Sequence, residues 1–166
     1  MPDTIESLLA DHPADAPAIG APGRDWLSYG GLRDLTASTR DALRAAGIGA
    51  TDRVAIVLPN GAEMATAFVT IAQLATTAPL NPAYREDEFA FYLEDLKAKA
   101  IVLEAGYDGP ALAAATRFGL TVLRLARDET APAGAFALTA ETAPGEAAAE
   151  GVPGASDIAL ILHTSG

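Results

Sequence analysis

Short apolar runs alternate with helix-like segments through the middle of this chain, and this alternation constrains the fold more than any other feature. The run 53–58 is apolar at every position after Arg53 and rich in β-branched side chains, as expected for a strand buried on both faces. Similar runs follow at 78–80, 100–104 and 120–125. Strands that alternate with helices form βαβ units, whose strands lie parallel in one sheet. The pattern therefore predicts an α/β fold, a mostly parallel sheet with helices on both faces.

The segments between these runs have the periodicity of helices that bury one face. We expect a short helix at 4–10 and longer helices at about 32–46, 60–75, 85–97 and 110–118. Asn60 is followed three residues later by Glu63, a spacing typical of a capping box, and this pair predicts the start of the helix at 60–75.

Composition excludes several classes of function. The chain has 22 acidic and 11 basic residues and a net charge of −11. No nucleic-acid partner is expected, because phosphate backbones are bound by clustered Lys and Arg. The absence of cysteine excludes disulfides, zinc–thiolate sites and thiol nucleophiles.

The uncharged stretch 64–84 contains Pro79, which would break a membrane-spanning helix, so a buried helix and no membrane span are expected. The first residues lack the features of a secretory signal, and we expect a cytoplasmic protein.

Residues 128–155 differ in composition from the rest of the chain. They are rich in Ala, Pro, Gly and Thr and contain no basic residue. Such a segment has few bulky side chains to bury, which predicts an extended or mobile connector. Phe136 and Leu138 are the residues expected to fix it to the body of the domain. Proteases should cut this connector before they cut within 53–104.

The end of the chain contains the candidate binding residues. The apolar run 158–162 predicts a buried strand, extending over about 157–164, that leads into Thr164-Ser165-Gly166. Hydroxyl groups and backbone N–H groups in such a turn can donate to a phosphate, and glycine permits close approach. Taken alone, the triplet is also compatible with a polar turn that closes a strand. We expect it at the carboxyl end of a sheet strand, where α/β folds bind ligands.

Three other positions have both a structural and a functional interpretation. His163 could be a ligand or a base, although a single histidine at a strand end is more often packed or solvated. Pro59 and Asn60 could line a pocket, but helix capping explains Asn60 without one. Tyr84 and Arg85 could contact a partner domain, and a role at the start of the next helix explains them equally well.

Several segments resemble the adenylate-forming superfamily, which includes acyl-CoA synthetases, luciferases and the adenylation domains of peptide synthetases. Thr164-Ser165-Gly166 is similar to the start of its Thr-Ser-Gly-Thr-Thr-Gly-x-Pro-Lys loop. Upstream segments resemble other family motifs in the same order: Asp25-Trp-Leu-Ser-Tyr-Gly-Gly-Leu32, Asp52-Arg-Val-Ala-Ile-Val-Leu-Pro-Asn60, Pro79-Leu-Asn-Pro-Ala-Tyr-Arg85 with Glu88, and Ala100-Ile-Val-Leu103. The resemblance covers roughly 20–126 and 156–166. His163 before the triplet favours similarity to oxalate–CoA ligases.

The resemblance implies that residues 1–166 are an incomplete N-terminal subdomain of an AMP-binding domain in an enzyme of the acyl-CoA synthetase type. Such an enzyme would use ATP and Mg²⁺ to activate a small carboxylic acid as an acyl-adenylate, and would then transfer the acyl group to coenzyme A. Thr164, Ser165 and Gly166 would bind ATP, and no residue is assigned a catalytic or metal-binding role. The chain alone is expected to be inactive and to self-associate through the edge formed by 158–162.

Two other interpretations stay open. One is an amino-acid-activating adenylation domain of the same superfamily, and the other is a non-catalytic α/β binding module. The gene sequence after Gly166 discriminates between them: Thr-Thr-Gly-x-Pro-Lys favours an adenylate-forming enzyme, and a stop codon favours the module. Neither a dinucleotide fingerprint nor a serine-hydrolase nucleophile motif occurs in the chain.

Overall fold

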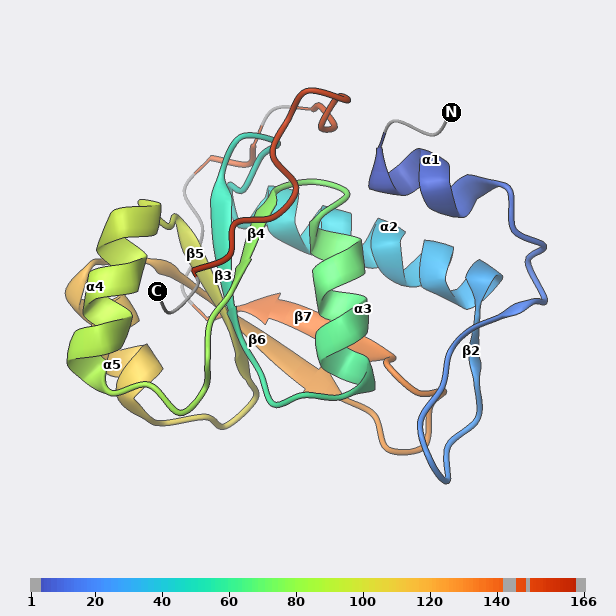
Figure 1. The fold of residues 1–166 in the computed structure, drawn as a ribbon, viewed down its shortest axis with the longest axis horizontal. Helices are drawn as coiled ribbons and strands as arrows, with labels where there is room; N and C mark the ends of the chain where they lie inside the picture. Colours follow the sequence, from blue (N-terminus) through green and yellow to red (C-terminus); the bar gives the residue numbers. More distant parts are fainter. Residues whose placement is uncertain (1–3, 142–145, 149, 164–166) are drawn as a thin grey trace.

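The computed structural model describes residues 4–141, 146–148 and 150–163. Within these residues, helices and strands alternate as the sequence predicts (Figure 1). The short strands β1 and β2 form an antiparallel ribbon, separate from the central sheet. The elements, in order, are α1 (Ile5–Ala10), β1 (Pro17–Ile19), β2 (Leu27–Ser28), α2 (Tyr29–Ala45), β3 (Arg53–Val57), α3 (Ala62–Ile71), β4 (Thr76–Pro79), α4 (Glu86–Leu96), β5 (Ala100–Glu104), α5 (Pro110–Arg117), β6 (Thr121–Arg127) and β7 (Phe136–Ala140).

The central sheet has the strand order β4-β3-β5-β6-β7. Strands β4, β3, β5 and β6 are parallel, and β7 pairs antiparallel with β6 at one edge. At the opposite edge, Leu160 forms a single parallel bridge with Thr77 of β4. The mostly parallel sheet predicted from the sequence is therefore confirmed.

Alternate residues of β3 contribute to cores on opposite faces of the sheet. Val54 and Ile56 belong to the cluster with α2 and α3, whereas Ala55 and Val57 belong to the cluster with α4 and α5. All four residues are at most 2% exposed. The strand is thus buried on both faces, as its continuous apolar run predicts, and the helices cover both sides of the sheet.

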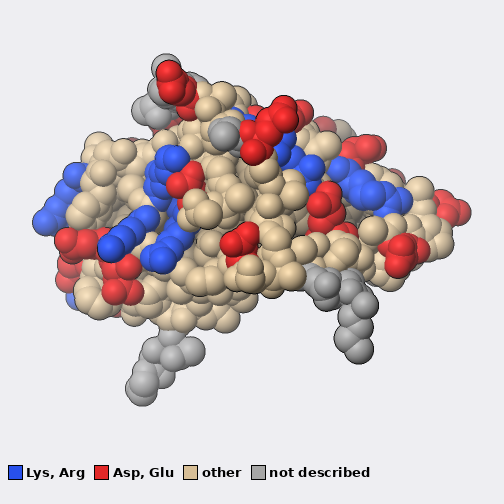
Figure 2. All heavy atoms as spheres, turned by 90° about the horizontal axis from the view of Figure 1, so that it is seen from above, with Lys and Arg blue, Asp and Glu red and all other residues tan. Residues whose placement is uncertain are grey.

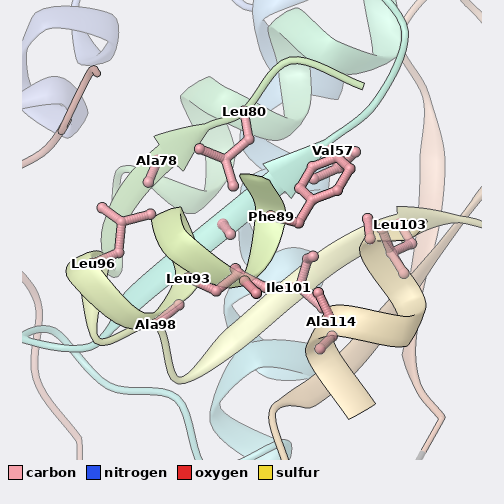
Figure 3. Packing of buried hydrophobic residues seen from close by; sticks show 14 of the residues in the cluster. Val57, Ala78, Leu80, Phe89, Leu93, Leu96, Ala98, Ile101, Leu103 and Ala114 are labelled. Carbon is pink, nitrogen blue, oxygen red and sulfur yellow. The ribbon is translucent and has the colours of Figure 1, made fainter. Parts of the chain in front are cut away.

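The core beneath α4 and α5 is centred on the apolar face of α4 (Figure 3). Phe89, Leu93 and Leu96 follow each other at helical spacing and are 0–2% exposed. Facing them, α5 contributes the fully buried alanines Ala111 and Ala114. These small residues let α5 lie close to α4 and the sheet.

Local capping explains the start of α2 but not that of α3. Helix α2 begins at Tyr29, before the predicted position, because the Ser28 hydroxyl accepts a hydrogen bond from Gly31 N–H at 3.1 Å. At α3 the N-cap is Gly61, which makes no side-chain cap. The capping box predicted for Asn60 and Glu63 is therefore wrong, because the Glu63 carboxylate is used in a tertiary ion pair instead.

That ion pair joins Glu63 to Arg24, which holds the loop between β6 and β7 against α3. The guanidinium also donates hydrogen bonds at 3.0–3.1 Å to three carbonyl oxygens, those of Asp128, Ala131 and Pro132. Burial opposes ionisation of Glu63, but the hydrogen bond and charge of Arg24, with help from backbone N–H groups, outweigh it and lower the pKa of Glu63.

Gly134 is required in this loop. Its φ is 83°, and a Cβ at this position would lie 2.6 Å from Thr66 Cγ2. The Thr66 hydroxyl also donates a hydrogen bond to Gly134 O at 2.6 Å. Only a residue without a side chain lets the loop approach α3 this closely.

The segment 128–155 contains a strand that was not predicted. Strand β7 pairs with β6 from Phe136 beside Arg127 to Ala140 beside Leu123. Phe136 and Leu138 pack against the cluster beneath α2 and α3, as expected of the residues that fix this segment. The strand could not be recognised from the sequence because its small side chains are not typical of a strand. It is stabilised by pairing with β6 rather than by its own composition. Mobility of the connector stays a prediction.

Acidic and basic side chains lie beside each other on the face shown in Figure 2. Among the described residues, the ion pairs include Arg40 with Glu6 at 3.1 Å and Lys99 with Asp52 at 2.7 Å. The uncharged stretch 64–84 forms most of α3, then β4 and the turn after it. No helix in the described part of the chain combines the length and the apolar character needed to cross a membrane.

Candidate functional site

The last described residues, 158–163, form an arm along the free edge of β4 (Figure 1). Thr77 N–H donates to Ala159 O, and Ile161 N–H donates to Thr77 O, both at 2.9 Å. These bonds make one parallel bridge, not the regular strand predicted over 157–164. Because the bridge is parallel, the arm runs in the direction of β4, toward the carboxyl end of the sheet.

Side chains of the arm form an exposed row and a covered row. Ile158, Leu160 and Leu162 are 56%, 38% and 61% exposed, whereas Ile161 packs against the core beneath α4 and α5. The prediction of a buried strand is wrong for the exposed row, because no described part of the chain covers that side. An uncovered apolar row at a sheet edge is a surface through which copies can associate.

We expect residues 1–166 to self-associate through this row. Replacing Leu160 and Leu162 together with serine should weaken self-association at least about tenfold, because less apolar surface is removed from water. Sedimentation velocity over a range of concentrations measures this change. If the unmodified chain sediments as a monomer at high concentration, the exposed row is not an association surface.

Two buried threonines of β4 hold the arm. Thr76 Oγ1 donates to Ile158 O at 2.6 Å, and Thr77 Oγ1 donates to Ala159 O at 2.8 Å. Thr76 is 5% exposed and Thr77 is 0% exposed. Neither was identified from the sequence, although a signal was present: a hydroxyl within a buried strand needs a hydrogen-bond partner.

His163 ends the described arm and contacts α4. Its Nε2 lies 3.1 Å from Asp95 Oδ2, and its ring centroid lies 4.6 Å from that of Tyr92. The side chain is 20% exposed, in agreement with the interpretation as a packed residue. Among the described residues, Nδ1 has no hydrogen-bond partner.

The turn after β4 lies next to these aromatic residues. Arg85 N–H donates to Glu88 Oε2 at 2.9 Å, which supports the helix-entry interpretation of Arg85. Tyr84 stacks on Tyr92 with ring centroids 5.0 Å apart, so aromatic contacts extend from the turn to His163. Hydrogen bonding with Tyr92, with smaller effects of burial and nearby charge, raises the pKa of Tyr84.

Pro59 and Asn60 line a cavity at the carboxyl end of β3, together with Glu63, Glu104 and Arg127 among others. The pocket-lining interpretation of Asn60 is therefore supported over capping. The cavity volume is about 190 Å³, below the range of roughly 300–1,000 Å³ that is usual for small-molecule sites. We assign it no ligand.

Thr164, Ser165 and Gly166, the predicted phosphate-binding residues, lie outside the described residues. Their position at the carboxyl end of a strand stays a prediction. The structure describes the segment that precedes them, because the arm includes His163, the residue immediately before Thr164. In the described ranges, no group of three or more His, Asp or Glu side chains could hold a metal ion.

Comparison with known proteins decides the family. The family model described as AMP-binding enzyme matches residues 6–166. This chain belongs to the AMP-binding enzyme family. The segments that resemble adenylate-forming enzymes, and the fold around them, are therefore those of a true family member.

Relatives of this AMP-binding family member match nearly the whole chain. It is 32% identical to a probable CoA ligase from Humulus lupulus, over 98% of this chain and 32% of the relative. It is 31% identical to an oxalate–CoA ligase from Arabidopsis thaliana, over 99% of this chain and 33% of the relative. Apo MatB from Rhodopseudomonas palustris superposes with a TM-score of 0.76 and 25% identity, over 100% of this chain and 33% of MatB. The chain thus spans about a third of these relatives and corresponds to their N-terminal part.

Proposed function

We propose that this chain is the N-terminal part of an ATP-dependent acid–CoA ligase of the acyl-CoA synthetase type. The observation that carries the proposal is the match to CoA ligases over 98–99% of the chain. The arm supports it, because it runs along β4 directly into Thr164-Ser165-Gly166, the triplet that resembles the start of the family's phosphate loop. A cytoplasmic location fits such an enzyme, since ATP and coenzyme A are available there.

In the proposed reaction, a carboxylate is joined to the adenylyl group of ATP with release of pyrophosphate. The thiol of coenzyme A then displaces AMP and forms a thioester. Mg²⁺ would accompany ATP and neutralise phosphate charge. From this chain, the hydroxyl and N–H donors of Thr164, Ser165 and Gly166 would bind phosphate oxygens. Groups that bind the adenine, the acid and Mg²⁺ are assigned to the two-thirds of the relatives that this chain does not match.

The test uses the full-length product of the gene that encodes this chain. With a panel of dicarboxylic, fatty and aromatic acids, and with oxalate included, at least one acid should give AMP and an acyl-CoA. Residues 1–166 alone should give neither product. AMP formation by residues 1–166 alone, or none by the full-length protein with any acid, would contradict the proposal. Pyrophosphate exchange with amino acids but no CoA thioester would favour an amino-acid-activating adenylation domain instead.

A further inference from the structure

We propose that Thr76 and Thr77 are positioning residues for the reaction. They fix the register of the arm on β4, and through the arm they fix the point at which the chain enters Thr164-Ser165-Gly166. The effect on catalysis rests on the proposed function. The effect on register rests on the described contacts alone.

Every hydrogen bond found between β4 and the arm involves one of these two threonines. Ala159 O accepts two of them, from Thr77 N–H at 2.9 Å and from Thr77 Oγ1 at 2.8 Å. A carbonyl oxygen has two lone pairs, so both bonds can form at once. The Thr76 hydroxyl donates a hydrogen bond to the carbonyl oxygen of the preceding residue, Ile158, at 2.6 Å. Two adjacent hydroxyls are thus matched to two adjacent carbonyls.

Apolar packing fixes this register only weakly. Ile158, Leu160 and Leu162 are exposed, so the arm buries little on that side. A slip of one residue would exchange the exposed and covered rows, because side chains alternate along an extended chain. It would also turn His163 away from Asp95 and Tyr92, the contacts that hold the end of the arm.

The hydroxyls can select the register because they are buried. Thr76 and Thr77 have almost no access to water, so a slipped arm that left them unpaired would be disfavoured. A buried threonine hydroxyl can also be satisfied within its own helix: Thr70 Oγ1 donates to Thr66 O at 2.8 Å within α3. Thr70 is 0% exposed, like Thr77, but its hydroxyl bonds within α3 rather than to the arm. It is therefore a matched control.

Register is tested by hydrogen exchange of the peptide containing residues 158–163 in the full-length protein. Thr77→Val removes the hydroxyl and keeps the shape, and it should make Ile161 N–H exchange at least about tenfold faster, since the arm opens more often. Thr76→Val should act in the same direction. Thr77→Ser, which keeps the hydroxyl, and Thr70→Val should leave the exchange of the arm unchanged. Unchanged exchange in both valine variants of β4 would overturn the proposal.

The effect on catalysis is tested by the kinetics of AMP formation. Thr77→Val should lower kcat/KM for ATP about tenfold or more, because small misplacements of binding groups are costly. KM for the acid should change no more than it does in Thr70→Val, and Thr77→Ser should restore kcat/KM. Unchanged kinetics in a variant with faster arm exchange would overturn the positioning role. If the wild-type protein forms no AMP, the proposed function fails, and the exchange experiment still decides on register.

Discussion

Replacing Phe89 with alanine should lower the free energy of unfolding by about 3–5 kcal/mol, the usual cost of removing a buried aromatic ring. Phe89 is 0% exposed and lies at the centre of the core between α4 and the sheet (Figure 3). It also meets Tyr84 edge to face, with ring centroids 5.7 Å apart. Urea unfolding followed by far-ultraviolet circular dichroism measures the change.

Phe91 provides the matched control for this experiment. It lies on the same helix two residues later, but it is 63% exposed. Phe91→Ala should therefore change the free energy of unfolding by less than about 0.5 kcal/mol. Equal losses in the two variants would mean that α4 does not bury the face described above. The Phe89 variant should also loosen the arm, because Asp95 and Tyr92 are carried by the same helix.

Replacing Arg24 with methionine should lower the free energy of unfolding by about 2–4 kcal/mol. Methionine keeps much of the apolar stem, so the loss reports on the guanidinium. The change leaves the Glu63 carboxylate, 15% exposed, without its cation. It also removes the donor for the loop carbonyls of Asp128, Ala131 and Pro132. Arg127→Met is the control, since its ion pair with Glu129 is exposed and should contribute less than about 1 kcal/mol.

The pH dependence of stability tests the same ion pair. Because folding lowers the pKa of Glu63, its contribution is fully present above the ordinary value of 4.5 and is lost as pH falls through the lowered pKa. Wild type should therefore be more stable than Glu63→Gln at neutral pH, and the difference should shrink as the solution is acidified below that value. A difference that is constant from neutral pH to strongly acidic pH would show that the carboxylate charge is not the stabilising feature.

The candidate site was only partly predictable. His163 was correctly interpreted as a packed residue, whereas the binding role of Thr164-Ser165-Gly166, inferred from residue types and from the resemblance, stays a prediction. Thr76 and Thr77 were missed, because their partners Ile158 and Ala159 lie 82 residues away in the sequence. Residue type alone does not show which distant carbonyl a buried hydroxyl meets.

The sequence by itself determined the alternation of strands and helices, the parallel pairing of the inner strands and the two covered faces. These features follow from local patterns: a continuous apolar run such as 54–57 is stable only when both of its faces are buried. Tertiary structure alone decided the pairing of β7 with β6, the use of Glu63 by Arg24 rather than by its own helix, and the exposed row of the arm. Each of these features depends on which segment, far away in the sequence, contacts a given surface. Local sequence patterns do not contain that information.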